Sequence, residues 1–263
     1  MNIIRRIVLS ALVMLVSASV FAADTTCSTS GSATEEFRYS WRLRGGVRFL
    51  AGLVFPTSGV GNLKTTFGDD RIHSELLITA PSGKQGGYYA YESDIDEAGK
   101  TLMTYHGYAW GKKSRNERTV FDYVKGLARI RKQTPEEVEN RVKKLPESDQ
   151  FRDILTAIYF LRQNASTMNR PVQTTIYSDG KEYPVIFQPA ERKNFIIDGR
   201  NTPTRSFRIV DAPGGKKWPG GVTVWLSDDD RRVPVRIEIQ QSMASLQLEL
   251  QKIESCTTLV ARL

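Results

Sequence analysis

The stretch Glu35-Glu36-Phe37-Arg38-Tyr39-Ser40-Trp41-Arg42-Leu43-Arg44 alternates apolar and polar side chains. From Phe37 to Leu43 the odd-numbered positions are apolar, and the even-numbered positions between Glu36 and Arg44 are polar. A period of two is that of a β-strand, whose successive side chains point to opposite faces of the sheet. The stretch therefore predicts a strand with one buried face and one face in water.

Similar short patterns, separated by Gly, Asp, Ser and Pro, recur along the rest of the chain. Such residues are the usual components of tight turns between strands. We expect further strands at 59–67, 72–80, 87–93, 101–110, 119–132, 171–177, 182–188, 195–197, 204–211, 222–226, 233–240 and 245–251. Many short strands in one chain predict a mainly β protein, built as a single antiparallel β-barrel or a strongly curved sheet.

One segment has a helical pattern instead. Ser148 is a suitable cap for an amphipathic helix over residues 149–163, whose apolar stripe predicts that it covers one end of the sheet. The charged stretch 133–146 is the only plausible domain boundary. Within it, Pro135-Glu136-Glu137 is also a suitable start for a short helix ending near Lys144.

The composition is that of an ordinary globular protein, with 40% hydrophobic, 25% charged and 10% aromatic residues among 263. These values exclude collagen, coiled coils and wholesale disorder. The chain has only 2 His and 2 Cys, which excludes most zinc sites because these need three or four such ligands. We expect no metal and no cofactor.

The N-terminus has the layout of a secretory signal peptide. Arg5 and Arg6 precede an apolar run over residues 7–16, and Val20-Phe21-Ala22 predicts cleavage after Ala22. The mature chain then has 263 minus 22, or 241, residues and a net charge of +8 minus 2, or +6. We expect a periplasmic protein without a transmembrane span after cleavage. A membrane anchor at the same place is the alternative.

The cysteines, Cys27 and Cys256, lie near the two ends of the mature chain. In an oxidising compartment they predict a disulfide, with two free thiols as the alternative. We expect a flexible lead-in at residues 23–34, a single β-rich domain at 35–256 and a C-terminal tail at 257–263.

No recognisable catalytic motif is present. His73 and His106 each fall inside an expected strand, and no Gly-x-Ser-x-Gly motif occurs. The acidic run Asp228-Asp229-Asp230 lacks the alternate spacing of a calcium loop, and we expect a charged hairpin turn instead. These residues leave the question of an enzyme open and favour a protein without catalytic activity.

Aromatic residues on the expected strands give the best indication of function. Small barrels either fill their interior with such side chains or hold an apolar ligand among them. A filled core is the alternative for these residues too. The aromatic residues that we expect to line the interior are Phe37, Tyr39, Trp41, Phe121 and Tyr123. Further aromatic residues recur on the expected strands at Phe67, Tyr89 and Tyr91.

Basic residues recur at period two on two of these strands. Arg38, Arg42 and Arg44 share one strand face, and Lys125, Arg129 and Arg131 lie on another. Their summed field favours an anionic envelope surface or lipid headgroups as a partner, with a pair of solvated sheet faces as the alternative. The expected compartment argues against nucleic acid.

Two motifs resemble a family of exported bacterial proteins, the domain-of-unknown-function 3108 family. Residues 153–162, DILTAIYFLR, are similar to its helix motif D-x-L-[ST]-x-x-Y-x-L-R, and residues 225–235, WLSDDDRRVPV, to its hairpin motif W-L-[ST]-D-D-x-x-R-x-P-V. Phe37-x-Tyr39 and residues 119–122 match loosely. The resemblance spans roughly residues 35–250.

The resemblance implies a signal peptide and a β-rich domain but no agreed activity. We interpret its motif residues as structural and expect Asp153 or Arg162 of the helix to pair with Arg232 or Asp228 of the hairpin. The full motif set is Asp153, Tyr159, Leu161, Arg162, Trp225, Asp228, Asp229, Arg232 and Pro234.

Two functions remain open. The first is a non-enzymatic periplasmic binding or chaperone-like protein that holds an apolar or lipid-like ligand. The alternative is a structural or assembly factor of the cell envelope that acts through its outer surface.

Overall fold

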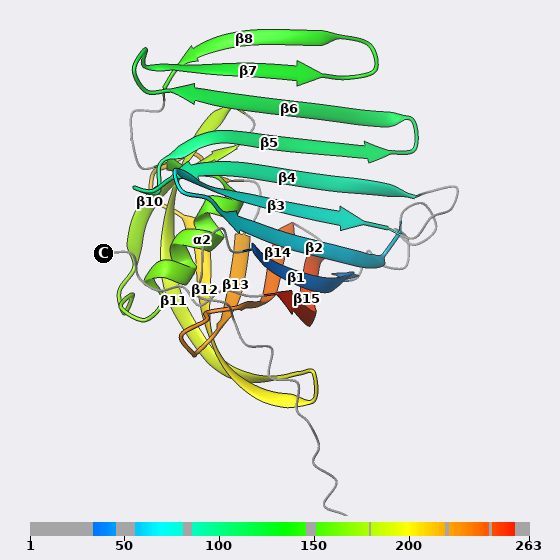
Figure 1. The fold of residues 1–263 in the computed structure, drawn as a ribbon, viewed down its shortest axis with the longest axis vertical. Helices are drawn as coiled ribbons and strands as arrows, with labels where there is room; N and C mark the ends of the chain where they lie inside the picture. The colour runs from blue at the N-terminus through cyan, green and yellow to red at the C-terminus, as the bar shows by residue number, and fades with distance from the viewer. Residues whose placement is uncertain are drawn as a thin grey trace, which may run out of the picture.

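The computed structural model describes residues 34–45, 56–80, 86–145, 151–178, 180–218, 221–241 and 244–255. These residues form one large curved sheet of fifteen strands, with the helix α2 (Ile154–Asn164) inside the curve (Figure 1). The prediction of a mainly β fold is confirmed, and the sheet is strongly curved but not closed. The expected signal peptide, Cys27 and Cys256 lie outside the described residues.

Most of the strands fall where the sequence predicts them. Their bounds are β1 (Thr34–Arg44), β2 (Ser58–Phe67), β3 (Arg71–Thr79), β4 (Gly87–Asp96), β5 (Thr101–Trp110), β6 (Lys113–Asp122), β7 (Leu127–Gln133), β8 (Val138–Lys144), β9 (Phe151–Arg152), β10 (Val172–Ser178), β11 (Lys181–Ile197), β12 (Arg200–Asp211), β13 (Gly221–Ser227), β14 (Pro234–Gln241) and β15 (Ala244–Ser255).

The chain enters the sheet at its centre. Strand β1 pairs with β2 on one side and with β15 on the other. The first meander runs outward from β1 to the edge strand β8, and the second runs from β10 back to β15. Every pair is antiparallel except β9 with β10, which is parallel. The link through β9 and α2 therefore carries the chain from one end of the sheet to the other.

Three segments form other elements than the sequence predicts. The single strand expected at 119–132 is two strands, β6 and β7, joined by a turn at residues 123–126. In the charged stretch 133–146, residues 134–137 form a turn and Val138–Lys144 form β8, so the short helix considered there is wrong. The strand expected at 195–197 is the end of the long strand β11.

Helix α2 begins five residues later than expected. Asp153, not Ser148, is its N-cap: its side chain accepts a hydrogen bond from Thr156 N, and the Thr156 hydroxyl accepts one from Asp153 N. This reciprocal pair is a capping box, which satisfies backbone N–H groups that a helix start leaves unpaired. No helix among the described residues is long and apolar enough to cross a bilayer.

The core lies between the concave face of the sheet and α2. Leu155, Ile158 and Leu161 of the helix are buried against that face. The predicted alternation of β1 is observed, since Phe37, Tyr39 and Trp41 are buried and face the interior. The strands contribute many more buried residues, among them Leu63, Leu76, Ile78, Val185, Phe187, Phe207, Ile209, Val222, Val224, Ile237 and Leu248.

Side chains bridge the opening that the backbone leaves. Phe121 of β6 lies 4.6 Å from Phe151 of β9 and 5.2 Å from Tyr177 of β10, measured between ring centroids. Farther along, Lys143 Nζ of β8 donates to the carbonyl oxygen of Gly180 at 3.0 Å. The two ends of the sheet therefore meet along a seam of aromatic and charged contacts.

Candidate binding cavity

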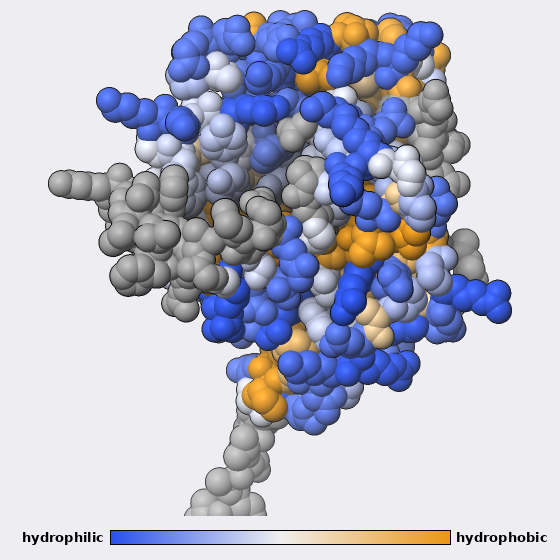
Figure 2. Space-filling view, turned by 180° about the vertical axis from the view of Figure 1, so that it is seen from behind, coloured by the Kyte–Doolittle hydropathy of each residue, from blue (hydrophilic) through white to orange (hydrophobic). Residues whose placement is uncertain are grey.

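A cavity of about 260 Å³ lies inside the curve of the sheet. Its volume is slightly below the range of about 300–1,000 Å³ common for small-molecule pockets. The molecule is hollowed near the middle of the face shown in Figure 2, where hydrophobic surface lies among hydrophilic residues. The apolar part of the wall consists of Leu76, Ile78, Ile154, Ile158, Ile176, Trp218, Val222, Ile237, Ile239 and Leu248.

The other part of the wall is polar and lies toward the seam. It is formed by β4 to β6 and the end of β10, through Tyr91, Thr104, Tyr105, His106, Glu117, Thr119, Tyr177 and Ser178. The rings of Tyr91 and His106 stack at 4.7 Å with an angle of 10° between their planes. Burial raises the pKa of Tyr177 to about 12, so its hydroxyl stays neutral at physiological pH. The cavity therefore has an apolar end and a polar end.

Asp153 lies at the wall where α2 begins. Its carboxylate caps the helix and accepts a hydrogen bond from Ser93 Oγ of β4. Burial raises the pKa of this carboxyl, while the hydrogen bonds from Ser93 and Thr156 act in the opposite direction. The residue thus holds the helix start against β4.

Aromatic rings continue from the cavity along β4 and β5. Tyr89 lies 5.8 Å from Tyr108 and 5.4 Å from Trp110, and Tyr108 lies 6.4 Å from His106. Tyr89 remains 37% exposed. The row presents aromatic surface beside the polar end of the cavity.

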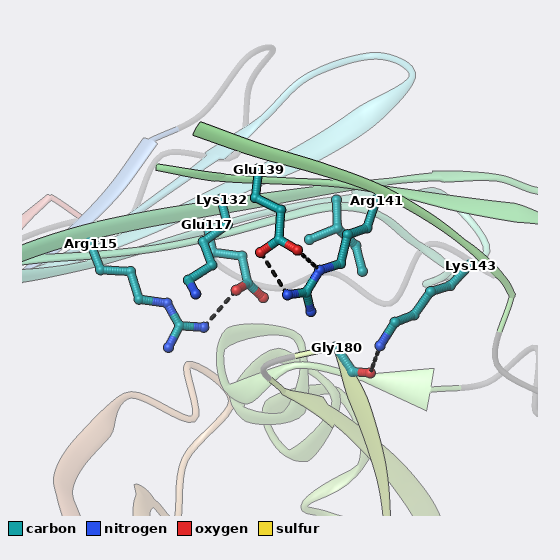
Figure 3. Close-up of a pocket in the computed structure, with 8 residues that line it drawn as sticks. Arg115, Glu117, Lys132, Glu139, Arg141, Lys143 and Gly180 are labelled. Atoms are coloured by element: carbon teal, nitrogen blue, oxygen red, sulfur yellow. Dashed lines mark hydrogen bonds and ion pairs between the residues drawn. The ribbon is translucent and has the colours of Figure 1, made fainter. Parts of the chain in front are cut away.

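A charged cluster occupies the next part of the concave face. Figure 3 shows its side chains pointing from β6, β7 and β8 toward Gly180. Arg115 Nη2 lies 2.6 Å from Glu117 Oε2, and Arg141 pairs with Glu139. The members of this charged cluster are Arg115, Glu117, Lys132, Glu139, Arg141 and Lys143, which surround a recess of about 60 Å³.

The five residues expected to line a ligand site in the interior are inside the protein but do not surround the cavity. Phe37 and Tyr39 are fully buried and Trp41 nearly so, all within the packed core. Phe121 and Tyr123 belong to the aromatic contacts at the seam. None of the five is among the residues that surround the cavity.

The two histidines are on different faces of the sheet. His73 Nδ1 lies 2.6 Å from Asp94 Oδ1 of the neighbouring strand, away from the cavity. His106 lines the cavity and is the cross-strand partner of Glu117. Within the described part of the chain, no group of three His, Cys, Asp or Glu is arranged to hold a metal ion.

The acidic run forms the charged turn that the sequence predicts. Asp229 Oδ1 accepts hydrogen bonds from Ser227 Oγ and from the backbone N–H groups of Arg231 and Arg232. Asp229 also pairs with the Arg231 side chain at 2.9 Å. These contacts stabilise the turn between β13 and β14, and they give both oxygens of the Asp229 carboxylate hydrogen-bond partners within the turn.

The expected pairing of helix and hairpin occurs with different atoms. Arg162 pairs with Glu35 of β1 and donates to the carbonyl oxygens of Arg231 and Arg232. Arg232 in turn donates to the carbonyl oxygens of Arg162 and Gln163. The carboxylate partner of the helix is thus in β1, and the hairpin contributes backbone oxygens.

The remaining motif residues also make contacts within the fold. Asp228 lies 3.5 Å from Arg192 rather than against the helix. Tyr159 accepts a hydrogen bond from Gln163, and Leu161 is fully buried. Trp225 packs edge-on against Phe195 at 5.3 Å.

Pro234 joins the hairpin to the central strand. Its carbonyl oxygen accepts the Tyr39 hydroxyl at 2.7 Å. This contact ties the hairpin motif to β1, which already pairs with the helix through Glu35.

The basic residues of β1 and β7 lie on the convex side or near its turns. Arg42 lies 2.5 Å from Glu249, and Arg38 lies 3.6 Å from Glu254. Arg129 lies 3.9 Å from Asp122. Part of their charge is therefore balanced by carboxylates on the neighbouring strands.

Comparison with known proteins identifies a family and a fold. The family model described as "Protein of unknown function (DUF3108)" matches residues 48–251, so the loose likeness noted in β1 lies outside the matched segment. No curated protein matches the chain. A β-barrel-like protein of the DUF1849 family from Brucella abortus is similar in structure, with a TM-score of 0.55 and 9% sequence identity over 86% of this chain and 98% of that chain. That similarity concerns the fold alone.

Proposed function

Since the chain belongs to the DUF3108 family, whose function is unknown, we propose a function from its own cavity: a non-enzymatic periplasmic binding or chaperone-like protein that holds an apolar or lipid-like ligand. The observation that carries this proposal is an apolar cavity of about 260 Å³ with one polar end. Apolar walls with a few polar groups are typical of ligand sites.

The cavity wall comes from elements far apart in the sequence. Leu76 is in β3, Ile158 in α2 and Leu248 in β15. An apolar group placed among them loses its contact with water, at a gain of about 25 cal/mol per Å² of buried apolar surface. The curved sheet and helix hold these residues in place, so the site is formed before the ligand arrives.

Filling the cavity tests the proposal. Thr104→Phe adds a ring inside it, and the matched control Thr223→Phe adds the same ring on the outer face of β13, between the inward residues Val222 and Val224. We expect the Thr104 variant to bind the neutral apolar dye Nile red about tenfold more weakly than wild type. The control should bind as wild type does.

Protein purified from its native envelope gives the second readout. We expect native mass spectrometry to detect a co-purifying apolar molecule in wild type and less of it in the Thr104 variant. Equal dye binding by both variants and no co-purifying molecule would refute the proposal.

Export is part of the same proposal. It is supported by Arg5, Arg6 and the apolar run that follows them. N-terminal sequencing of protein from the periplasmic fraction should begin at Ala23. A mature protein that begins at Met1 would contradict it.

A specific observation also favours the alternative, an envelope assembly factor. The edge strand β8 exposes Val138 and Val142, at 52% and 62%, and has an unpaired side. Exposed apolar residues on a free edge are a common site of protein association. If this edge is the working surface, Val142→Glu should abolish complementation of a deletion strain, whereas Thr104→Phe should not.

A further inference from the structure

The concave face changes character along one cross-strand row. Leu76 of β3 pairs in register with Tyr91, Tyr91 with His106, His106 with Glu117, and Glu117 with Lys132. Directly paired residues point to the same face of a sheet. The row therefore runs from an apolar side chain through two stacked rings to a pair of opposite charges.

The length of this row suits an extended molecule. Four strand spacings separate Leu76 from Lys132, and neighbouring strands lie about 4.8 Å apart, which gives about 19 Å. Glu117 lines both the cavity and the recess of the charged cluster. The apolar and charged parts of the row are thus contiguous.

The charged cluster has an excess of positive charge. It contains four cations and two carboxylates. Arg115 and Arg141 are paired with the carboxylates, and Lys143 Nζ donates to the Gly180 carbonyl. Lys132 is half-buried and makes no hydrogen bond or close ion pair with the described residues. Its charge nevertheless acts on Glu139, whose pKa is lowered first by Arg141 and also by Lys132. The cluster thus has two more cations than carboxylates and an ammonium group, that of Lys132, with no hydrogen-bond partner among the described residues beside the polar end of the cavity.

We propose that Lys132 and the charged cluster around it bind an anionic headgroup, of the phosphate or carboxylate class, on the ligand whose apolar part occupies the cavity. This inference rests on the proposed function, since it assigns the other end of the same ligand. A phosphate or carboxylate accepts charge-assisted hydrogen bonds from an ammonium group. Partial burial reduces the screening of that attraction by salt and water.

Two ligands with the same alkyl chain and different headgroups test the inference. Octyl phosphate and octyl glucoside are titrated into the purified protein below their micellar concentrations, with inorganic phosphate as a third probe. We expect wild type to bind octyl phosphate about tenfold more tightly than octyl glucoside. Raising the salt from about 0.05 to about 0.5 M should reduce this preference, because salt screens the headgroup.

Lys132→Gln should remove most of the preference and leave the affinity for octyl glucoside unchanged. The matched control Lys125→Gln removes an exposed lysine of the turn between β6 and β7 and should keep the preference. The wild-type comparison of heads needs no variant, so it decides the question even if Lys132→Gln does not fold.

The outcomes separate the two proposals. If neither octyl compound binds, the cavity proposal fails. If both bind equally in wild type, the cavity proposal stands and the headgroup inference is overturned. Inorganic phosphate binding as tightly as octyl phosphate would also overturn the inference. The octyl group would then add nothing to the affinity, and the anion site would not belong to a ligand whose apolar part occupies the cavity.

Discussion

Arg162 of α2 and Glu35 of β1 form an ion pair inside the protein, with distances of 2.6 Å between Nη1 and Oε2 and 3.0 Å between Nη2 and Oε1. Both side chains are almost fully buried, at 3% and 1% exposed. Arg162 Nε and Nη2 also donate to carbonyl oxygens of the hairpin between β13 and β14. One guanidinium therefore joins the helix, the central strand and the hairpin that carries the second family motif.

Removing one partner of this pair should destabilise the protein strongly. Glu35→Gln leaves the Arg162 charge buried without its carboxylate, and we expect a loss of about 3–5 kcal/mol in the free energy of unfolding. Urea denaturation monitored by tryptophan fluorescence measures it. Glu36→Gln, on the opposite face of β1, is the control and should cost about 1 kcal/mol or less.

Replacing both partners tests the physical reason. Glu35→Leu combined with Arg162→Leu leaves no uncompensated charge, and we expect it to be more stable than Glu35→Gln alone. A double variant less stable than Glu35→Gln would show that the hydrogen bonds to the hairpin, and not the ion pair, dominate.

Arg232 should stabilise the end of the helix. Its Nη1 donates to the carbonyl oxygens of Arg162 and Gln163 at 3.2 Å, which are among the last carbonyls of α2. Such carbonyls have no partner within a helix, and a cation there also interacts favourably with the helix dipole. We expect Arg232→Ala to lower stability by about 1–3 kcal/mol and to lower the melting temperature.

The backbone of Arg232 offers a second comparison at the same position. Its φ of 48° is in the left-handed region, which costs a residue with a Cβ about 1 kcal/mol relative to glycine. Arg232→Gly should therefore be more stable than Arg232→Ala by about that amount. Equal stability of the two variants would mean that the turn relaxes when the side chain is removed.

The strands were predictable because their signal is local. In β1 each apolar residue from Phe37 to Trp41 is buried as the alternation indicates. The turn between β6 and β7 was missed because Val124 resembles a strand residue, although it is 98% exposed. Gly126, with φ of 64°, is the signal that identifies this turn.

The start of the helix was misplaced because two capping residues compete in the sequence. Ser148 precedes a suitable apolar stripe, but Phe151 and Arg152 pair with β10 instead. Asp153 followed by Thr156 is the pattern of a capping box in which Thr takes the usual Glu position. The pairing of β9 with β10 decides the boundary, and it is not visible in the local sequence.

The cavity could not be predicted from the strands one at a time. Its wall combines Leu76 of β3 and Leu248 of β15, which the sheet order brings near each other, with Ile158 of α2, which packs inside the curve. Aromatic alternation did include Tyr91, which lines the cavity. It favoured Phe37 and Tyr39 as well, but β1 is the central strand and its inward side chains are covered by the core and α2.

The two cysteines should form a disulfide. Glu36 near the start of β1 is in register with Ser255 at the end of β15, so the chain segments that lead to Cys27 and Cys256 begin side by side. Mass spectrometry of protein from the periplasmic fraction after alkylation should show no free thiol, and two alkylated cysteines only after reduction. Alkylation of both cysteines without reductant would contradict the prediction.

Asp153 should make stability fall as the pH rises above about 4. Burial raises the pKa of its carboxyl above the ordinary value, so the folded protein binds this proton more tightly than the unfolded chain. Between the two pKa values the folded state holds more protons, and raising the pH therefore favours unfolding. Asp153→Asn keeps an oxygen for the cap without the charge.

We expect the stability of Asp153→Asn relative to wild type to increase with pH from about 4 upward, because only wild type then pays for a buried carboxylate. Ser93→Ala removes a hydrogen bond that opposes the rise in pKa, so its stability should fall more steeply with pH than that of wild type. Urea denaturation at several pH values between about 4 and 8 measures both differences. Parallel curves for wild type and Asp153→Asn would show that the carboxyl titrates alike in the folded and unfolded chain, and that Ser93 and Thr156 fully offset its burial.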